Sequence, residues 1–255
     1  MGQTEEPAPD YATIGPLRVQ RLSRAELSRR ALAALAPGAF PLAVAFCNAH
    51  TAEIALRDRA YRAALDRFLV VNDGVGLEIA VRLLEGRGFP DNLNGTDFVP
   101  SLFGDLTRRT RLYLLGAQSG VAEEAGRRFS ERFPLLEVVG ARDGYFSAEE
   151  EEAVVAAVAA AAPDILLVAF GNPRQELFIA RHFEALGARL MFGVGALLDF
   201  AAERVARAPR WMRQARLEWA FRLAQEPGRL LRRYTIETAG FLIAVLKLRF
   251  SAPGR

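Results

Sequence analysis

The sequence predicts a doubly wound α/β fold with a mostly parallel sheet, followed by a helical, basic C-terminal appendage. Short runs of branched aliphatic residues alternate with Ala/Arg/Glu-rich segments of helical character over most of the 255 residues. Glycine and small polar residues follow the aliphatic runs, at the places where parallel sheets bind their ligands. Beyond Gly195 the strand pattern stops and arginine accumulates. These observations favour one α/β domain with an extension.

The alternation assigns the individual elements in order along the chain. The expected strands are Leu42–Phe46, Phe68–Asn72, Leu112–Gly116, Leu136–Gly140, Ile165–Phe170 and Leu190–Val194. The expected helices are Ala52–Asp66, Gly76–Glu85, Val121–Arg132, Ala148–Ala162 and Gln175–Leu186. The helix over 148–162 is rich in alanine and has acidic residues in its first turn, which complement the helix dipole. Strands joined by helices in this way indicate a Rossmann-like sheet covered on both faces.

Charge and composition divide the chain into three expected parts. Residues 1–15 read as a loose, disordered polar lead-in without the apolar segment of a secretory signal. Residues 16–203 form the expected α/β catalytic domain, and 204–255 the helical appendage. The appendage has twelve Lys/Arg against three Asp/Glu, a net charge of +9, although the whole chain carries only +3. The remainder is therefore at about −6, and we expect the appendage to meet an anionic partner.

The composition also restricts compartment and chemistry. A single cysteine, Cys47, excludes an intrachain disulfide and a thiolate zinc site, so the cytosol is the default compartment. No run of about 18 apolar residues occurs, and the longest candidate, Ala239–Leu246, is too short to span a bilayer. The chain contains no Asp-x-Asp pattern, which many nucleotide-sugar transferases use to hold a divalent ion. We expect neither a metal nor another cofactor.

Polar residues directly after the expected strands are the first candidates for chemistry. Asp73, followed by Gly74, ends one strand and is placed to act as a general base or to cap the next helix. Asn48 could bind a hydroxyl or, about as well, cap a helix. Gly171, Pro173 and Gln175 begin a helix whose free N–H groups could face an anion, although such a helix needs no ligand.

Several motifs in fixed order resemble the WecG/TagA/CpsF glycosyltransferase family over roughly Leu42–Tyr234. In the C-terminal third they are Gly193-Val-Gly195, Asp199-Phe200, Arg207-Ala-Pro-Arg-Trp211, Leu217-Glu-Trp219, Arg222-Leu223, Gln225-Glu-Pro227 and Arg233-Tyr234. Earlier in the chain, Asp73-Gly-x-Gly76 and Gly171-Asn-Pro-Arg-Gln-Glu176 match the family's signatures. Each motif is weak alone, but their order and spacing are specific.

The resemblance implies roles for individual residues. Asp73 is the expected general base, Asn48 and Gln175 orient sugars, and Arg222, Arg229 and Arg232 neutralise the charge of a diphosphate. The expected substrate-binding residues are Gly74, Thr96, Asp97, Gly171, Pro173, Gly193, Gly195 and Asp199, the last of which holds a uridine. Asp199 could instead cap a helix or pair with Arg204 or Arg207, Asp97 could be an ordinary cap, and the arginines could be a solvated helix face.

Two positions depart from the family pattern. Phe46 stands where the family has a threonine two residues before its asparagine, and Asn92 stands where it has an arginine. Neither replacement can supply the missing hydroxyl or positive charge. The donor sugar of this chain, within a family that transfers N-acetylmannosamine, its uronic acid or glucose, therefore stays open.

The resulting expectation is an inverting, metal-independent glycosyltransferase. It would move a sugar from a UDP-sugar donor to an undecaprenyl-diphosphate-linked saccharide, a polyprenyl-diphosphate-linked acceptor, in cell-surface polysaccharide biosynthesis. The aromatic and basic tail would lie on the anionic cytoplasmic face of the inner membrane without spanning it. A homo-oligomer is compatible with the sequence, and nucleic acid is not expected as a partner.

Two other functions are alternatives to a glycosyltransferase. A nucleotide-binding oxidoreductase would use Gly193-Val-Gly195, but Leu198 stands where the third glycine of the dinucleotide motif would fall. A nucleic-acid-binding protein would use the basic tail and bind with steep salt dependence.

Overall fold

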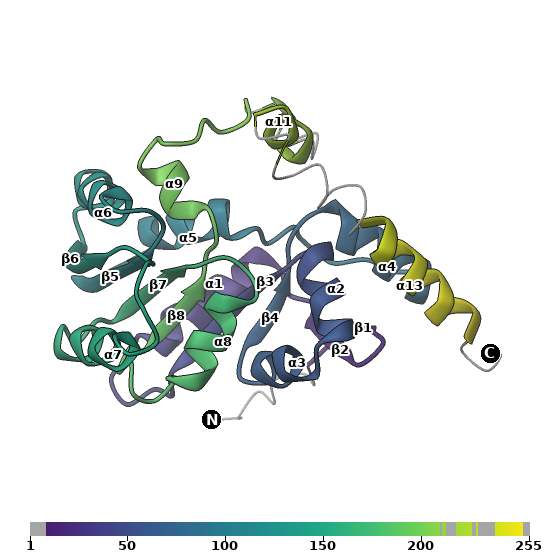
Figure 1. Cartoon of the computed structure of the whole chain (residues 1–255), viewed down its shortest axis with the longest axis horizontal. Helices are drawn as coiled ribbons and strands as arrows, with labels where there is room; N and C mark the ends of the chain where they lie inside the picture. The colour runs from purple at the N-terminus through teal and green to yellow at the C-terminus, as the bar shows by residue number, and fades with distance from the viewer. Residues whose placement is uncertain (1–8, 210, 213–217, 226–227, 229–237, 252–255) are drawn as a thin grey trace, which may run out of the picture.

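The computed structural model describes residues 9–209, 211–212, 218–225, 228 and 238–251 (Figure 1). Its centre is an eight-stranded sheet with the strand order β1-β2-β4-β3-β8-β7-β5-β6. Neighbouring strands pair in parallel throughout, except for the antiparallel pair β1–β2. The predicted doubly wound α/β fold is therefore confirmed.

The six strands and five helical segments predicted from the sequence are all present, with some changes in extent. The strands are β1 (Tyr11–Ile14), β2 (Leu17–Gln20), β3 (Leu42–Cys47), β4 (Leu69–Asn72), β5 (Thr110–Gly116), β6 (Leu136–Arg142), β7 (Ile165–Ala169) and β8 (Leu190–Gly193). The helices are α1 (Arg24–Ala34), α2 (Ala49–Arg57), α3 (Arg59–Leu65), α4 (Val75–Glu85), α5 (Gly95–Gly104), α6 (Val121–Arg132), α7 (Glu151–Ala160), α8 (Arg174–Arg181), α9 (Leu197–Ala201), α11 (Glu218–Gln225) and α13 (Thr238–Ser251).

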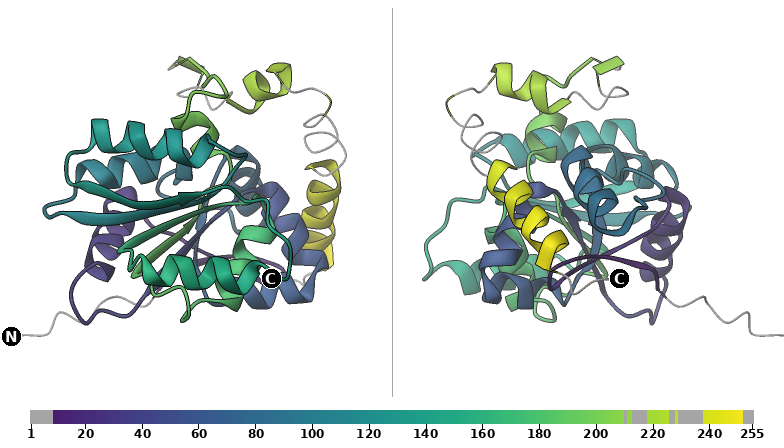
Figure 2. Two further views of the ribbon diagram at one scale, coloured as in Figure 1. Left: turned by 60° about the vertical axis from the view of Figure 1, so that its left-hand side comes forward. Right: turned by 90° about the vertical axis from the view of Figure 1, so that its right-hand side faces the viewer.

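The helices cover both faces of the sheet, as the two turned views show (Figure 2). Helices α1, α5, α6 and α9 bury their apolar side chains in one core on the first face. Helices α2, α3, α4 and α13 contribute to a second core on the opposite face, and α7 and α8 to a third beside it. The central strands β3, β7 and β8 are thus enclosed from both sides, which explains their nearly continuous apolar runs, whereas the edge strand β6 is only partly buried.

The helix predicted over Ala52–Asp66 is instead two helices, and Asp58 is the reason. Its carboxylate accepts hydrogen bonds from the backbone N–H groups of Ala60 and Tyr61, at 2.8 and 3.1 Å, and so starts α3. The N–H of Asp58 itself closes the last turn of α2 on Ile54. One residue therefore ends one helix and caps the next, and the chain changes direction there.

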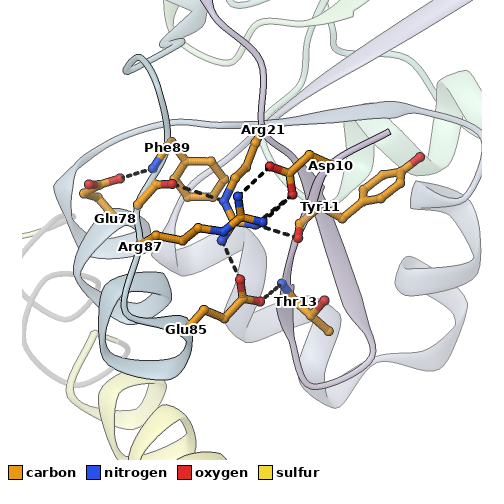
Figure 3. A network of polar contacts seen from close by, with 9 residues as sticks. Asp10, Tyr11, Thr13, Arg21, Glu78, Glu85, Arg87 and Phe89 are labelled. Atoms are coloured by element: carbon orange, nitrogen blue, oxygen red, sulfur yellow. Dashed lines mark hydrogen bonds and ion pairs between the residues drawn. The ribbon is translucent and has the colours of Figure 1, made fainter. Parts of the chain in front are cut away.

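The N-terminal hairpin corrects the expectation of a disordered lead-in over 1–15. Residues Tyr11–Ile14 form β1, which pairs with β2 and joins the sheet edge beside β4. A buried guanidinium fastens it: Arg21 donates to the Asp10 carboxylate at 3.2 Å, and to Glu85 at the end of α4 (Figure 3). Arg21 also donates to the carbonyl of Gly88, so the hairpin and the loop after α4 are tied together. These contacts span more than 60 residues of sequence, out of reach of a local pattern.

Helix α13 packs onto the domain, in contact with α2 and α4 (Figure 1). Phe241 and Val245 on its inner side are fully buried in the second core. Leu248 lies close to Gly15 in the hairpin turn. The expectation that the aromatic residues of the tail lie on a membrane is wrong for Phe241, because this ring belongs to the core.

Candidate active site

Four strands that are neighbours in the sheet end at one edge, and the candidate residues follow them there. In the order β4, β3, β8, β7, the chain continues into Asp73, Asn48, the turn after Gly193, and Gly171. Because all four strands run parallel, their carboxyl ends share this edge. In doubly wound sheets such an edge is the ligand-binding crevice.

The turn after β4 holds Asp73 in a partly exposed position. Its N–H donates to the carbonyl of Cys47 at the end of β3, at 2.7 Å, which binds the two strand ends together. Gly74 follows with φ of +87°, a conformation that a side chain would strain, and α4 begins at Val75. The partly exposed carboxylate therefore lies at this edge of the sheet, beside the N-terminus of α4.

Asn92, which replaces the family's arginine, stabilises this turn. Its side-chain oxygen accepts a hydrogen bond from the N–H of Gly74 at 2.8 Å. The backbone around it is also tied to β4, because the N–H of Leu93 donates to the carbonyl of Asn72 at 3.1 Å. The amide therefore supports the Asp73 turn and brings no positive charge.

Phe46, which replaces the family's threonine, is buried in the core. Its ring stacks on Phe192 with centroids 6.0 Å apart, and Phe98 lies 6.2 Å away. No hydroxyl group is therefore available at this position in the crevice. Sequence alone showed the departure but not its consequence for packing.

Asn48 caps α2. Its side-chain oxygen accepts from the N–H groups of His50 and Thr51, at 3.0 and 3.1 Å. The capping alternative is thus confirmed, and a contact of Asn48 with a sugar stays a prediction. A side chain at Gly76 would come within 3.1 Å of Ala49, so the first turns of α2 and α4 lie against each other. Two helix N-termini consequently meet at the crevice, where their N–H groups favour an anion.

Gln175 is buried and joins the two remaining turns. Its side-chain oxygen accepts from the N–H of Gly171, at 3.2 Å, and from the N–H of Gly195, at 3.1 Å. The amide nitrogen donates to Glu176 at 2.7 Å. With only 2% of its surface exposed, Gln175 is placed to organise these turns rather than to reach a sugar directly.

Glu176 is the residue of this site whose importance the sequence did not reveal. It is fully buried, and its Oε1 accepts from the amides of Gln175 and Asn172, each at 2.7 Å. Burial raises the pKa of Glu176 to about 7, although the amide donors and the Tyr61 hydroxyl act to lower it. As the second residue of α8 it resembled an ordinary acidic residue in a first helical turn.

Gly193 makes room for this pair. A Cβ there would lie 2.8 Å from the amide nitrogen of Gln175 and 3.1 Å from Oε1 of Glu176. The glycine predicted for the nucleotide pocket is therefore required by protein side chains that pack against its backbone.

Thr96 and Asp97 lie in the first turn of α5, and Asp97 connects this helix to the appendage. Asn94 caps the helix by accepting from the N–H of Asp97 at 2.9 Å. The Asp97 carboxylate accepts from Arg207 at 2.9 Å, and Arg207 lies 3.4 Å from Glu218 of α11. The cap is Asn94 and not Asp97, and the Asp97 carboxylate is engaged by the side chains of Asn94 and Arg207.

The remaining candidates are only partly described. Asp199 lies in α9, directly after the turn at Gly195, and its carbonyl accepts from the N–H of Arg204 at 2.9 Å. Pro173 directly precedes α8, a position where a backbone nitrogen without a hydrogen costs the helix no hydrogen bond. Arg222 belongs to α11, but its side chain, together with Arg229 and Arg232, lies outside the described residues.

No group of three or more His, Cys, Asp or Glu side chains in the described part of the chain could hold a metal ion. A groove of about 800 Å³ lies between α1 and α5, with Ser28, Phe98 and Asp105 among its lining residues. None of the predicted site residues lines this groove, so it does not belong to the crevice.

Comparisons with known proteins agree with the geometry. The sequence profile of the Glycosyl transferase WecG/TagA/CpsF family matches residues 12–255. An enzyme from Bacillus subtilis (strain 168), N-acetylglucosaminyldiphosphoundecaprenol N-acetyl-beta-D-mannosaminyltransferase, is 30% identical over 202 residues, which cover 78% of this chain and 77% of that enzyme. The enzyme of the same name from Bacillus spizizenii (strain ATCC 23059 / NRRL B-14472 / W23) is 30% identical over 195 residues, covering 76% and 74%. The matched region includes the turns at Asp73, Gly171 and Gly195 and the helical appendage, and the chain belongs to the Glycosyl transferase WecG/TagA/CpsF family.

Proposed function

We propose that the protein is an inverting, metal-independent glycosyltransferase that moves a sugar from a UDP-sugar to an undecaprenyl-diphosphate-linked saccharide. The observation that carries this proposal is the position of Asp73, a partly exposed carboxylate at the carboxyl edge of the sheet. The chain that presents it belongs to a glycosyltransferase family. The names of the two Bacillus relatives indicate the class of acceptor, a diphosphoundecaprenol bearing N-acetylglucosamine.

In the proposed step Asp73 accepts the proton of an acceptor hydroxyl while that oxygen attacks the anomeric carbon of the donor. The new bond joins the acceptor oxygen to the anomeric carbon, and the bond to the UDP oxygen breaks with its electron pair on the diphosphate. Attack from the face opposite UDP inverts the anomeric configuration. General base catalysis of this kind contributes about 10²- to 10⁴-fold to a rate.

The leaving diphosphate carries negative charge that the protein must stabilise. The adjoining N-termini of α2 and α4 supply N–H groups and the positive ends of two helix dipoles. We assign the rest of the neutralisation to Arg222, Arg229 and Arg232 and the nucleoside contact to Asp199. Preorganised donors of this kind can replace a divalent ion.

The donor is identified by incubating the protein with membranes that contain lipid-linked acceptor and a panel of UDP-sugars, then weighing the product by mass spectrometry. Transfer of one hexose-type sugar, undiminished in EDTA, is the expected result. Thermal stabilisation by UDP but not by NAD accompanies it. Stabilisation by NAD with no transfer from any UDP-sugar would instead support an oxidoreductase.

The outer side of α13 supports peripheral membrane binding. Ile243, Leu246 and Phe250 form a stripe along it, 55%, 43% and 81% exposed, with the exposed Lys247 and Arg249 on either side. An apolar stripe flanked by cations suits a helix lying in the headgroup region of an anionic bilayer. Trp211 and Trp219, elsewhere in the appendage, are 63% and 42% exposed. No helix in the described residues is long and apolar enough to cross a membrane.

Flotation with phosphatidylglycerol vesicles tests this surface. The double variant Ile243→Asp/Phe250→Asp is expected to lose at least about tenfold in vesicle binding, because two side chains no longer enter the bilayer. Phe40→Asp is the matched control, since Phe40 is 93% exposed in a loop outside the appendage. Equal loss in the control, or none in the double variant, would contradict the assignment. Location on the cytoplasmic face of the inner membrane and a homo-oligomer stay predictions.

A further inference from the structure

A buried carboxyl group lies directly behind two turns of the candidate site. Glu176 has no exposed surface, yet its Oε1 is the shared acceptor of the Gln175 and Asn172 side-chain amides. The Tyr61 hydroxyl also acts on this carboxyl group, although neither it nor Oε2 makes a close hydrogen bond among the described residues. Burying an acidic group in this way is costly, so its retention calls for a function beyond packing.

The contacts of Glu176 determine which way the Gln175 amide faces. An amide can be rotated by half a turn at little cost in shape, which exchanges its donor and acceptor ends. Here Oε1 of Glu176 accepts from the NH₂ end of Gln175, which therefore faces it. The carbonyl end then faces the N–H groups of Gly171 and Gly195, as the geometry shows.

We propose that Glu176 is a positioning residue of the donor pocket, which fixes the Gln175 and Asn172 amides and thereby sets the spacing of the glycine turns after β7 and β8. This inference rests on the proposed UDP-sugar function, which assigns those turns to the donor. Gln175 links the turns through its carbonyl end, and Glu176 satisfies the opposite, NH₂ end of the same amide. The absence of a side chain at Gly193 lets the pair reach the sheet.

Two variants of Glu176 distinguish the position of its acceptor oxygen from its negative charge. Glu176→Gln keeps an oxygen that can accept from both amides, whereas Glu176→Asp keeps the charge but withdraws the oxygen by one methylene. We expect Glu176→Gln to bind UDP within about threefold of the wild type, and Glu176→Asp to bind about tenfold more weakly, as loss of one to two hydrogen bonds would produce. Isothermal titration calorimetry with UDP measures both.

A matched control uses a carboxylate that contacts the other end of α8. Glu151 of α7 lies 2.7 Å from His182, which directly follows α8, and it also accepts from Arg181. Glu151→Asp is expected to leave UDP affinity unchanged. If Glu176→Asp binds UDP like the wild type, or Glu176→Gln loses as much as Glu176→Asp, the positioning role is refuted. If the wild type itself binds no UDP, the donor assignment fails instead.

Exchange of the two residues provides a second test that does not depend on the folding of Glu176→Asp. Gln175→Glu places two carboxyl groups against each other, and we expect about tenfold weaker UDP binding or more. The double variant Gln175→Glu/Glu176→Gln restores a donor opposite an acceptor and should recover most of that loss. A double variant no better than Gln175→Glu would overturn the proposal.

Discussion

Two carboxyl groups lie near the same buried thiol and differ in almost everything else. Burial raises the pKa of Cys47, and the charges of Asp73 and Glu176 raise it further, which places both acids close to the end of β3. Asp73 stands partly exposed in a turn held by backbone contacts, whereas Glu176 is enclosed in a helix and faces amides. The same functional group therefore suits proton transfer at one position and orientation of neighbours at the other.

The largest expected effect tests the first half of that comparison. Asp73→Asn keeps the shape of the side chain but removes its ability to accept a proton, so kcat should fall about 10²- to 10⁴-fold. UDP affinity should stay near the wild-type value, because the helix N-termini that face the diphosphate are unchanged. Single-turnover transfer and UDP calorimetry on the same preparation separate the two quantities.

A folded Asp73→Asn variant with nearly normal turnover would remove Asp73 from the general-base role. Asp91→Asn is the control, since its carboxylate accepts from the N–H of Arg24 at 2.8 Å and belongs to the α1 side of the loop.

The protonation of Glu176 is expected to make the free energy of unfolding depend on pH. Burial raises the pKa of Glu176 from the ordinary value of about 4.5 to about 7 in the folded state. Between pH 4.5 and pH 7 the folded protein therefore keeps this proton, whereas the unfolded chain has released it. The resulting contribution is complete below about pH 4.5 and is lost as pH rises through 7. Glu176→Gln cannot titrate and should therefore gain on the wild type by about 2 to 3 kcal/mol between pH 5 and pH 8.

Urea unfolding at the two pH values measures this difference. Cys47 and Tyr61, the other titratable groups in contact with Glu176, have pKa values raised by burial and stay protonated over this range. A difference between variant and wild type that is the same at pH 5 and pH 8 would mean that Glu176 keeps one charge state throughout.

Asn92 supports the Asp73 turn from behind, as Glu176 supports the opposite turns, and its removal should cost less. Asn92→Ala leaves the N–H of Gly74 without its acceptor, which should lower the free energy of unfolding by about 1 kcal/mol. Displacement of the Asp73 carboxylate should lower kcat by about tenfold. Asn92→Asp retains the acceptor oxygen and should keep the stability of the wild type. Equal stability in all three proteins would show that water replaces the hydrogen bond.

The sequence predicts those parts of the fold that burial controls over short distances. The strands before Asn48, Asp73, Gly171 and Gly195 are enclosed on both sides, so their apolar runs and the glycine turns after them are visible in the sequence. The β1–β2 hairpin escaped notice because its support comes from Arg21, through contacts with residues far along the chain.

The site divides in the same way. Asp73 could be found because an acid followed by glycine directly after a buried strand is a local signal. Glu176 could not be found in this way, because an acidic residue in a first helical turn is normally solvated. Its burial depends on Gly193, which lies in a strand, β8, and not in the same helix. Three of the predicted arginines are not tested, since their side chains lie outside the described residues.

The smallest expected effect concerns Asp97, which the sequence assigned to substrate and the structure joins to Arg207. This ion pair is partly exposed, with 25% and 31% of the two side chains accessible, so it should contribute only about 0.5 to 1 kcal/mol to stability. If the pair accounts for Asp97, then Asp97→Asn should have no further effect in the Arg207→Gln background, although Arg207→Gln alone should cost more because it also loses Glu218. Arg204→Gln, an exposed arginine in the same segment, should change nothing. A carboxylate that also contacts substrate would behave differently: Asp97→Asn would lower kcat/KM further in the Arg207→Gln background. Asp97 would then resemble Asp73, as a carboxylate presented to ligand, whereas full non-additivity would assign it with Glu176 to the groups that hold the site in place.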